Sequence, residues 1–481
     1  MSENCPWYLE TLVDAAKRLR TGEVTSVELT KAMLARIEKV DDYYKAYTLT
    51  CGSAALEQAK TADQEIFDGK YKGRLHGIPV AVKDILHIAG KPMAVGSAIL
   101  RGSVSQYDAA VVEKLKAAGA VVLGKLNMPE FAMSGYPELP MSGYHPDMPM
   151  PVNPWNGDYW PGSSSSGSGV ATAAGMAYGT IGTDTGGSII FPASSNGVVG
   201  IKPTFGSVSR YGCFPLSYTL DHIGPITRCV EDAAVMLQAI AGYDFRDIYS
   251  ADVGVSDYLV SMKNGVKGMR IGVDEAFIAV KGVHPEVSQS VRDALDVLKA
   301  AGAKIVSVDI AGLVDMGNLW GSIVSYEAVQ IHREYYPSRA EEYGPVFKNF
   351  LKSGLEIKSA DYEAVQTIVL QAREIISKAL KDVDIIACPA SPVPTGIIKG
   401  LGPQAIIPPE AAVFLWMYTV PFNYSGSPTI TLPCGFESSS RMPLGLQLVG
   451  SLHGEAAIIQ AAYAYEQLTN WHLQTPPGLT D

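Results

Sequence analysis

Hydroxyl and glycine residues are concentrated in residues 161–210, a stretch that is almost free of charge. It reads PGSSSSGSGVATAAGMAYGTIGTDTGGSIIFPASSNGVVGIKPTFGSVSR. Serine hydroxyls can attack an acyl carbon or relay protons, and glycine lets backbone N–H groups approach a ligand closely. A nucleophile site needs these parts, so we expect the chemistry of the chain to be centred on this stretch.

The stretch resembles the signature of the amidase signature family, which has a GSS-type serine cluster, then GTDTGGS, then a GVVGLKPT-like segment. The resemblance implies that Ser188, in GTDTGGS, is the nucleophile and that Ser164, 24 positions earlier, is a bridging serine. In the family this bridging serine follows a cis peptide bond. The family base is the lysine of a segment like GIPVAVKD, which here is Lys83. The resemblance therefore predicts a triad of Lys83, Ser164 and Ser188.

The chemistry of these residue types supports a lysine base. A serine hydroxyl attacks only when a neighbouring base takes its proton, and no histidine lies between His145 and His222 to do so locally. An exposed lysine has a pKa of about 10.4 and stays protonated near pH 7. Lys83 ends the apolar run IPVAVK, which predicts a strand that carries it into the interior. Burial lowers a lysine pKa, so Ser164 could pass the Ser188 proton to Lys83 and return it to the leaving nitrogen.

The residues around the nucleophile supply candidate oxyanion donors. Thr185, Gly186, Gly187 and Ser188 present consecutive backbone N–H groups, and the two glycines permit a sharp turn. Preorganised donors of this kind are worth on the order of 10²–10³ in rate each. Gly-Gly-Ser also occurs in many ordinary loops, and serine runs are more often linkers. The combination with Lys83 is what favours a catalytic interpretation.

Other interpretations of the same glycines fail in detail. The segment from Gly162 to Gly167 has the glycine spacing of a P-loop, but Ser168 stands where the phosphate-binding lysine belongs. A nucleophile elbow needs G-x-S-x-G, whereas Ser188 lies in GGSII and Ser164 in GSSSS. No metal-ligand spacing is present, and the resemblance implies neither a metal nor an organic cofactor.

A second set of candidates follows residue 125. The segment LNMPEFAMSG resembles the family segment that borders the acyl pocket, which predicts Met133 and Ser134 as substrate-binding residues. The loop after it, residues 134–151, is rich in proline and departs from the family pattern. It could form an adaptable apolar flap over the substrate or simply cover the core. The candidate flap residues are Tyr136, Met141, Tyr144, Met148 and Met150.

Asp184 lacks the partner that the resemblance implies. In the family this aspartate is structural and commonly pairs with an arginine two residues beyond the nucleophile, but that position here is Ile190. Arg210 and Arg228 are alternative partners. Ser194-Ser195-Asn196 also departs from the usual AFC-like run. We expect neither departure to abolish the triad.

The elements that must position these residues alternate between helix and strand. Residues 9–40 predict two helices separated at Thr21-Gly22, the second capped by Thr25 or Ser26 with Glu28. Further helices are expected at 53–67, 108–118, 231–242, 285–301 and 455–468, and residues 312–381 are mainly helical. Strands are expected at 46–50, at Lys83, after each LKAAGA segment, and at 269–274, 384–388 and 429–433. The alternation indicates an α/β fold.

Composition bounds the class of protein. The chain has 481 residues, 47% of them hydrophobic and 18% charged, with a net charge of −11 that argues against nucleic-acid binding. The amino terminus lacks the regions of a signal peptide, and the most apolar run, residues 411–421, is too short to span a membrane. Six scattered cysteines suit reduced thiols. We therefore expect a cytoplasmic protein that does not bind membranes.

The resemblance covers nearly the whole chain and completes the prediction. It implies one amidase domain over residues 1–481, with a catalytic core at about 75–230 and a helical layer along the substrate channel at about 312–381. The implied fold is α/β, a mixed twisted central sheet of roughly ten strands covered by helices on both faces. The implied reaction is hydrolysis of a small amide through an acyl-enzyme, and family precedent favours a homodimer. Two alternatives stay open: a carbamate or ester hydrolase, and the glutamine-hydrolysing subunit of a tRNA-dependent amidotransferase.

Overall fold

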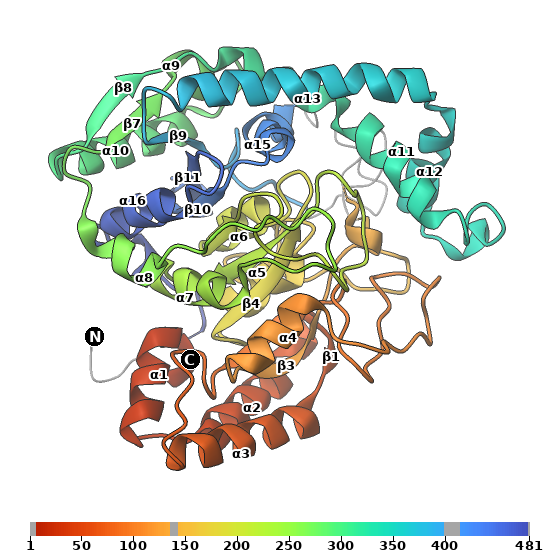
Figure 1. The fold of residues 1–481 in the computed structure, drawn as a ribbon, viewed down its shortest axis with the longest axis vertical. Helices are drawn as coiled ribbons and strands as arrows, with labels where there is room; N and C mark the ends of the chain where they lie inside the picture. Colours follow the sequence, from red (N-terminus) through yellow and green to blue (C-terminus); the bar gives the residue numbers. More distant parts are fainter. Residues whose placement is uncertain (1–5, 135–142, 399–413, 480–481) are drawn as a thin grey trace.

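A computed structural model describes residues 6–134, 143–398 and 414–479 of the chain. One mixed sheet of eleven strands runs through the described residues, and helices cover both of its faces (Figure 1). The expected α/β architecture is confirmed, with eleven strands in place of roughly ten. The strands, in order across the sheet, are β1 (Tyr47–Thr50), β3 (Val121–Leu126), β2 (Pro79–Lys83), β4 (Gly179–Asp184), β6 (His222–Thr227), β5 (Val199–Lys202), β10 (Thr429–Phe436), β11 (Pro443–Gly450), β9 (Ile385–Pro389), β7 (Arg270–Val273) and β8 (Lys304–Ser307).

The strand directions define two parallel groups, an antiparallel group between them, and the edge strand β1, which is antiparallel to β3. β2 pairs in parallel with β3 and β4, and β7 pairs in parallel with β8 and β9. Between these two parallel groups, β6, β5, β10 and β11 are antiparallel to their neighbours. Parallel strands need crossover connections, and helices supply them on both flanks.

Fifteen α-helices lie in the described residues, and their termini match the capping signals of the sequence. The helix predicted after Thr25 begins there with a complete capping box between Thr25 and Glu28, and the helix before it ends at Gly22 in the left-handed conformation. The helices are α1 (Leu12–Thr21), α2 (Ser26–Tyr44), α3 (Gly52–Phe67), α4 (Ala110–Ala117), α5 (Ser166–Ala173), α6 (Ile190–Asn196), α7 (Val230–Ile240), α8 (Tyr258–Ser261), α9 (Glu275–Ile278), α10 (Pro285–Ala300), α11 (Trp320–His332), α12 (Pro345–Glu356), α13 (Ser359–Ala379), α15 (Val420–Ser425) and α16 (Glu455–Gln467).

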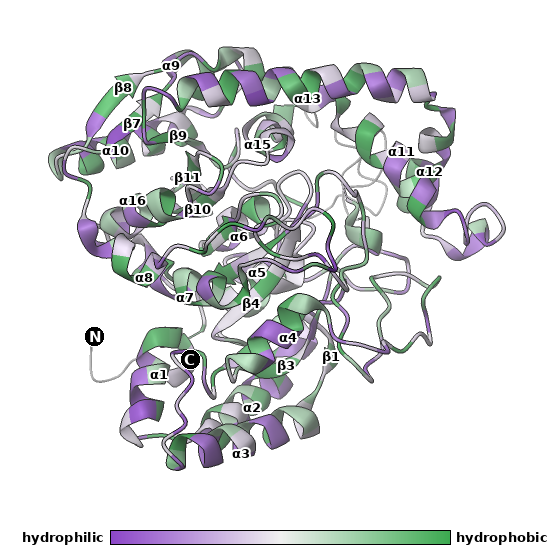
Figure 2. Cartoon of the chain, viewed as in Figure 1, coloured by the Kyte–Doolittle hydropathy of each residue, from purple (hydrophilic) through white to green (hydrophobic). Residues whose placement is uncertain are grey.

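The helices differ in how they are buried. α5 and α6 are buried at every residue, which explains their small, weakly polar sequences. α13 is amphipathic: Figure 2 shows hydrophilic and hydrophobic bands alternating along it, and its buried residues include Val365, Val369 and Ile376. α5 and α6 therefore form the interior of the molecule, whereas α11, α12 and α13 form the outer helical layer expected at residues 312–381.

The two ends of the described chain meet. The Tyr8 hydroxyl donates a hydrogen bond of 2.6 Å to the Leu479 carbonyl. One continuous hydrophobic core extends from Leu12 to Leu479 and includes residues of every part of the sheet. No helix in the described ranges is long and apolar enough to cross a membrane.

Candidate active site

The ends of two parallel strands bring the predicted triad residues together. β2 and β4 are paired in register at Val82 and Ile181, so both strands end at the same edge of the sheet. Lys83 is the last residue of β2, and the turn from Asp184 to Ser188 follows β4 directly. α5 begins at Ser166, which places Ser164 just before its first turn. Ligand sites commonly form at such strand ends.

Lys83 is completely buried and has only hydroxyl groups as hydrogen-bond partners. Its Nζ lies 2.8 Å from Ser164 Oγ, 2.8 Å from Thr183 Oγ1 and 3.1 Å from Ser165 Oγ. No carboxylate within the described ranges forms an ion pair with it. Burial therefore lowers the pKa of Lys83 to about 7, and the more distant negative charges of Asp184 and Asp221 offset this only in part. About half of the lysine is neutral at physiological pH.

The hydrogen bonds of Ser165 show which of these hydroxyls is able to donate a proton to Lys83. Its hydroxyl donates to the Thr183 carbonyl at 3.0 Å, and it accepts from the Thr183 N–H at 3.1 Å. Because its proton is committed to that carbonyl, Ser165 can only accept from Lys83. The bond between Lys83 and Ser164 carries no such constraint, so a neutral lysine can accept the Ser164 proton. The sequence analysis did not identify Ser165 or Thr183, and their serine and threonine types alone carried no signal for this role.

A backbone hydrogen bond holds the segment of Ser164 next to Ser188. The peptide bond between Ser163 and Ser164 is cis, as the family resemblance implies. The Ser165 N–H donates to the Ser188 carbonyl at 3.2 Å. The described residues contain no hydrogen bond between the Ser164 and Ser188 hydroxyls, which matches the loose geometry common to catalytic groups without substrate.

The turn before Ser188 has fewer free backbone N–H groups than expected. The Gly187 N–H donates to Asp184 Oδ1 at 2.8 Å, so it is already occupied. The N–H groups of Thr185, Gly186 and Ser188 make no hydrogen bond within the part of the chain that the structure describes. Of the four N–H groups predicted as oxyanion donors, those of Thr185, Gly186 and Ser188 are therefore free in the described residues, whereas that of Gly187 is bonded to the Asp184 carboxylate.

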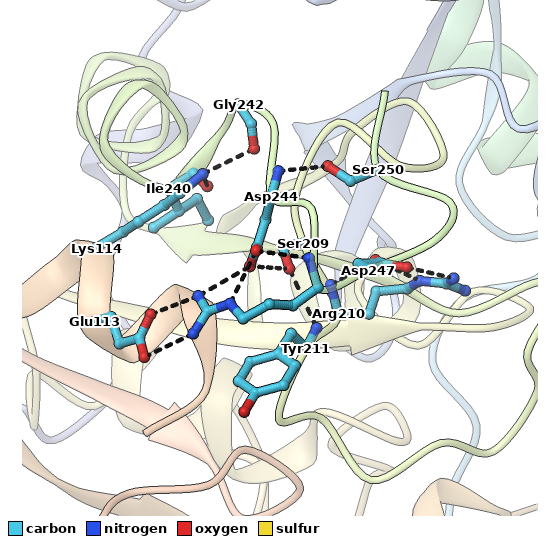
Figure 3. Close-up of polar contacts among 11 residues, drawn as sticks. Glu113, Lys114, Ser209, Arg210, Tyr211, Ile240, Gly242, Asp244, Asp247 and Ser250 are labelled. Atoms are coloured by element: carbon cyan, nitrogen blue, oxygen red, sulfur yellow. Dashed lines mark hydrogen bonds and ion pairs between the residues drawn. The ribbon is translucent and has the colours of Figure 1, made fainter. Parts of the chain in front are cut away.

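Asp184 is satisfied without an arginine. It accepts from the N–H groups of Gly187 and Ile189, and Asn423 Nδ2 donates to Oδ1 at 2.8 Å. Neither predicted partner reaches it. Arg210 pairs with Asp247 at 3.1 Å, in the polar network of Figure 3. Arg228 donates to backbone carbonyls of residues 10, 172 and 177. The side-chain amide of Asn423 in α15 and the backbone N–H groups of the turn therefore donate the hydrogen bonds that an arginine was expected to donate.

A cavity of about 260 Å³ opens beside Ser188. Hydroxyl groups and aromatic rings line it, and no charged side chain does so within the described ranges. The main aromatic residues are Trp160, Phe191, Trp320, Phe414 and Trp416, and the hydroxyl residues are Ser134, Ser163, Ser188, Ser194, Ser195, Ser391 and Thr395. The sequence analysis identified none of the aromatic residues, because they lie up to 256 positions apart and belong to no common motif.

The predicted substrate-binding residues divide between the cavity and the core. Ser134 lines the cavity, and its hydroxyl contacts that of Ser163. Met133 is fully buried and does not line the cavity. It packs into the hydrophobic core instead. From the helical layer at 312–381, Trp320 reaches the cavity.

The flap hypothesis concerns a loop that is only partly described. Tyr136 and Met141 lie outside the described residues. Tyr144 is buried and donates a hydrogen bond of 2.7 Å to Ser166 Oγ. Neither Tyr144, Met148 nor Met150 lines the cavity. These three residues therefore do not form a cover over it.

Comparisons with known proteins agree with this geometry. The model of the Amidase family matches residues 28–459. The provisionally named amidase AmiD of Mycobacterium tuberculosis is 39% identical over 469 residues, which cover 97% of this chain and 95% of that protein. A glutamyl-tRNA(Gln) amidotransferase subunit of Geobacter sp. is 38% identical over 492 residues, which cover 97% of this chain and 99% of that relative. Among solved structures, 6-aminohexanoate cyclic dimer hydrolase has a TM-score of 0.88 at 25% identity and covers 99% of this chain and 100% of that chain.

Proposed function

The chain belongs to the amidase signature family and is an amidase, a hydrolase of carbon–nitrogen bonds, and we propose that Ser188 is its nucleophile, Ser164 its proton relay and Lys83 its base. The observation that carries this proposal is the hydrogen bond of 2.8 Å between Ser164 and a fully buried lysine whose pKa is lowered to about 7. A buried lysine without an ion-pair partner lowers the folding stability of a protein. Such lysines occur at functional sites, where they transfer protons.

The proposed reaction has two half-reactions. Neutral Lys83 takes the Ser164 proton while Ser164 takes that of Ser188, whose oxygen forms a bond to the amide carbon. The carbonyl electron pair moves to the oxygen, where free N–H groups of the turn stabilise it. When the pair returns, the C–N bond breaks, Ser164 gives its proton to the leaving nitrogen, and Lys83 returns a proton to Ser164 and is neutral again. Water then attacks the acyl-enzyme by the same proton route, releasing the acid and restoring Ser188.

The cavity favours an uncharged substrate with an apolar or aromatic acyl group. Five aromatic side chains can pack against such a group, whereas an unpaired charge would lose its hydration without compensation. Carbamates and esters present the same carbonyl, so they remain candidate substrates. We expect a panel of neutral aryl amides to be hydrolysed faster than amides bearing a charged acyl group. Equal kcat/KM values across the two sets would contradict this substrate class.

The lining of the same cavity bears on the amidotransferase alternative. Several relatives of this chain are amidotransferase subunits, and the substrate of the alternative function would be glutamine. Glutamine carries an ammonium and a carboxylate, which need charged partners when they are buried, and none lines the cavity in the described part of the chain. We therefore expect the purified chain to hydrolyse aryl amides without partner proteins and to have little glutaminase activity. Glutaminase activity that depends on added partners would favour the alternative.

The test of the triad is covalent labelling by a fluorophosphonate, followed by intact-protein mass. We expect the wild type to gain one adduct, and Ser188→Ala and Lys83→Ala to label at least 100-fold more slowly. Ser168→Ala is a matched control, because Ser168 lies in the same serine-rich segment but donates to the Ile181 carbonyl and does not line the cavity. Labelling of Ser188→Ala at the wild-type rate would contradict the assignment of the nucleophile.

Three further properties are part of the proposal: the location, the oligomeric state and the domain organisation. The cysteines at 51, 213, 229, 388 and 434 are all free, which supports a reducing, cytoplasmic location. A homodimer is proposed on family precedent and is tested by sedimentation of the purified chain. Residues 1–481 are proposed to form one amidase domain.

A further inference from the structure

The carbonyl groups of the turn before Ser188 are individually anchored. The Thr185 carbonyl accepts a hydrogen bond of 2.9 Å from Trp320 Nε1, and the Gly187 carbonyl accepts one of 2.8 Å from the Phe191 N–H. In a trans peptide the carbonyl and the N–H of the next residue point in opposite directions. These two anchors therefore orient the N–H groups of Gly186 and Ser188, the residues of the turn that line the cavity.

The peptide between these two is satisfied on both of its sides. The Gly186 carbonyl accepts from Thr419 Oγ1 at 2.8 Å, and the Gly187 N–H of the same peptide donates to Asp184. It has nothing left to donate to a substrate. The direction of each donor in the turn thus depends on what holds the carbonyl of its peptide.

Trp320 differs from the other anchors because it also forms the cavity wall. It begins α11, is 5% exposed, and its ring lies 5.0 Å from that of Trp416. The indole is packed directly on the turn: a Cβ added at Gly186 would lie 2.6 Å from Trp320 Nε1. The Trp320 side chain therefore both lines the cavity and holds the peptide that carries the Gly186 N–H.

We propose that Trp320 is a positioning residue for the oxyanion hole, in addition to being part of the acyl-group wall. This inference rests on the proposed function, in which the turn stabilises the oxyanion. Its indole N–H holds the Thr185–Gly186 peptide so that the Gly186 N–H faces the reacting carbonyl. Trp320 touches the peptide and not the reacting atoms, so its contribution appears in the transition state more than in substrate binding.

The first experiment replaces the indole donor but keeps an aromatic wall. Trp320→Phe is expected to lower kcat about tenfold with KM changed less than twofold, because one oxyanion donor loses its orientation. The affinity for a trifluoromethyl ketone, which forms a tetrahedral adduct on Ser188, is expected to fall by a similar factor, whereas that for the acid product stays within twofold. Trp416→Phe is the matched control, since its indole makes no hydrogen bond in the described residues; its effect is expected in KM.

A second variant keeps the test decisive if Trp320→Phe folds poorly. Gly186→Ala keeps all five aromatic side chains but pushes the Trp320 indole away from the Thr185 carbonyl, and is expected to lower kcat as well. In the double variant the two losses should not add, because both act through one hydrogen bond. A Trp320→Phe variant that raises KM alone, or additive losses in the double variant, would overturn the inference.

Failure of this inference is distinguishable from failure of the proposed function. If the wild type is labelled by the fluorophosphonate at Ser188 and Trp320→Phe retains its kcat, only the role of Trp320 is wrong. If the wild type is not labelled at Ser188, the proposed nucleophile itself is wrong.

Discussion

The single residue on which the proposed chemistry depends most is Lys83. A buried cation is normally neutralised by a carboxylate, as Asp84 does for Lys125 at 2.7 Å. Lys83 is surrounded by three hydroxyls, which solvate an amine but do not hold it charged. Neighbouring lysines at the ends of β2 and β3 thus have opposite environments. The charged pair is structural, and the unpaired lysine can exchange a proton near neutral pH.

The lowered pKa of Lys83 predicts the acid limb of the pH profile. Burial shifts this pKa downward to about 7, so the neutral amine that acts as base is lost as the pH falls through that value. We expect kcat/KM to be nearly constant above pH 8 and to fall about tenfold per pH unit below 6. The measurement is kcat/KM for a neutral amide between pH 5 and 9. An acid limb near pH 4 would indicate that a carboxylate, and not Lys83, is the base.

At the scale of elements, the close approach of α5 to β4 builds the lysine site. Gly182 of β4 has no side chain, and a Cβ there would lie 2.7 Å from Ser165 Oγ. Ser165 in turn bonds both Thr183 and Lys83. The glycine of this strand is thus a packing requirement of the site, because anything larger would push the start of α5 away from the sheet.

Gly182→Ala tests this packing. We expect a loss of about 1–3 kcal/mol in the free energy of unfolding, since the added methyl overpacks a buried contact. A fall in kcat should accompany it as Ser165 moves away from Lys83. Denaturant titration and steady-state kinetics measure the two effects. Gly254→Ala is the matched control because a Cβ there meets no atom within 4 Å; equal behaviour of the two variants would show that the contact is unimportant.

At the scale of the whole molecule, the sheet joins distant parts of the sequence. β5 pairs with β10, which lies more than 200 residues later, and β11 pairs with β9. The helical layer is tied to the catalytic region through buried Glu327 of α11, which accepts from Ser217, Thr219 and Tyr362. The strand pairing and these side-chain contacts connect the two flanks of the sheet.

We therefore predict that the chain unfolds as one cooperative unit. The six tryptophans lie at positions from 7 to 471 and report on all parts of the core, whereas far-UV circular dichroism reports on the helices. The transitions followed by the two probes in guanidinium chloride are expected to coincide. Two separate midpoints would contradict a single domain and would indicate that β7, β8 and β9 form a unit of their own.

The sequence by itself determined the features that depend on neighbouring residues, namely most of the helices and their ends. Caps and apolar periodicity predicted α1 to α3, α7, α10 and α16 with bounds close to those observed, because those signals act within one or two turns. β4, β5 and β6 were not predicted, since glycine-rich strands such as GTIGTD are stabilised by burial and pairing and lack a clear period. The triad prediction rested on a resemblance to known motifs. That resemblance was enough to predict that Lys83 and Ser164 lie together, and the structure has a hydrogen bond between them.

Only the tertiary structure decided what surrounds those motifs. Ser165 and Thr183 became partners of Lys83 because two strands and a helix meet there, and Asn423 replaced the expected arginine beside Asp184 because α15 packs on the same turn. Trp320 meets Thr185 across 135 positions of sequence. Contacts of this kind depend on the packing of complete elements, and no short segment contains the information that specifies them.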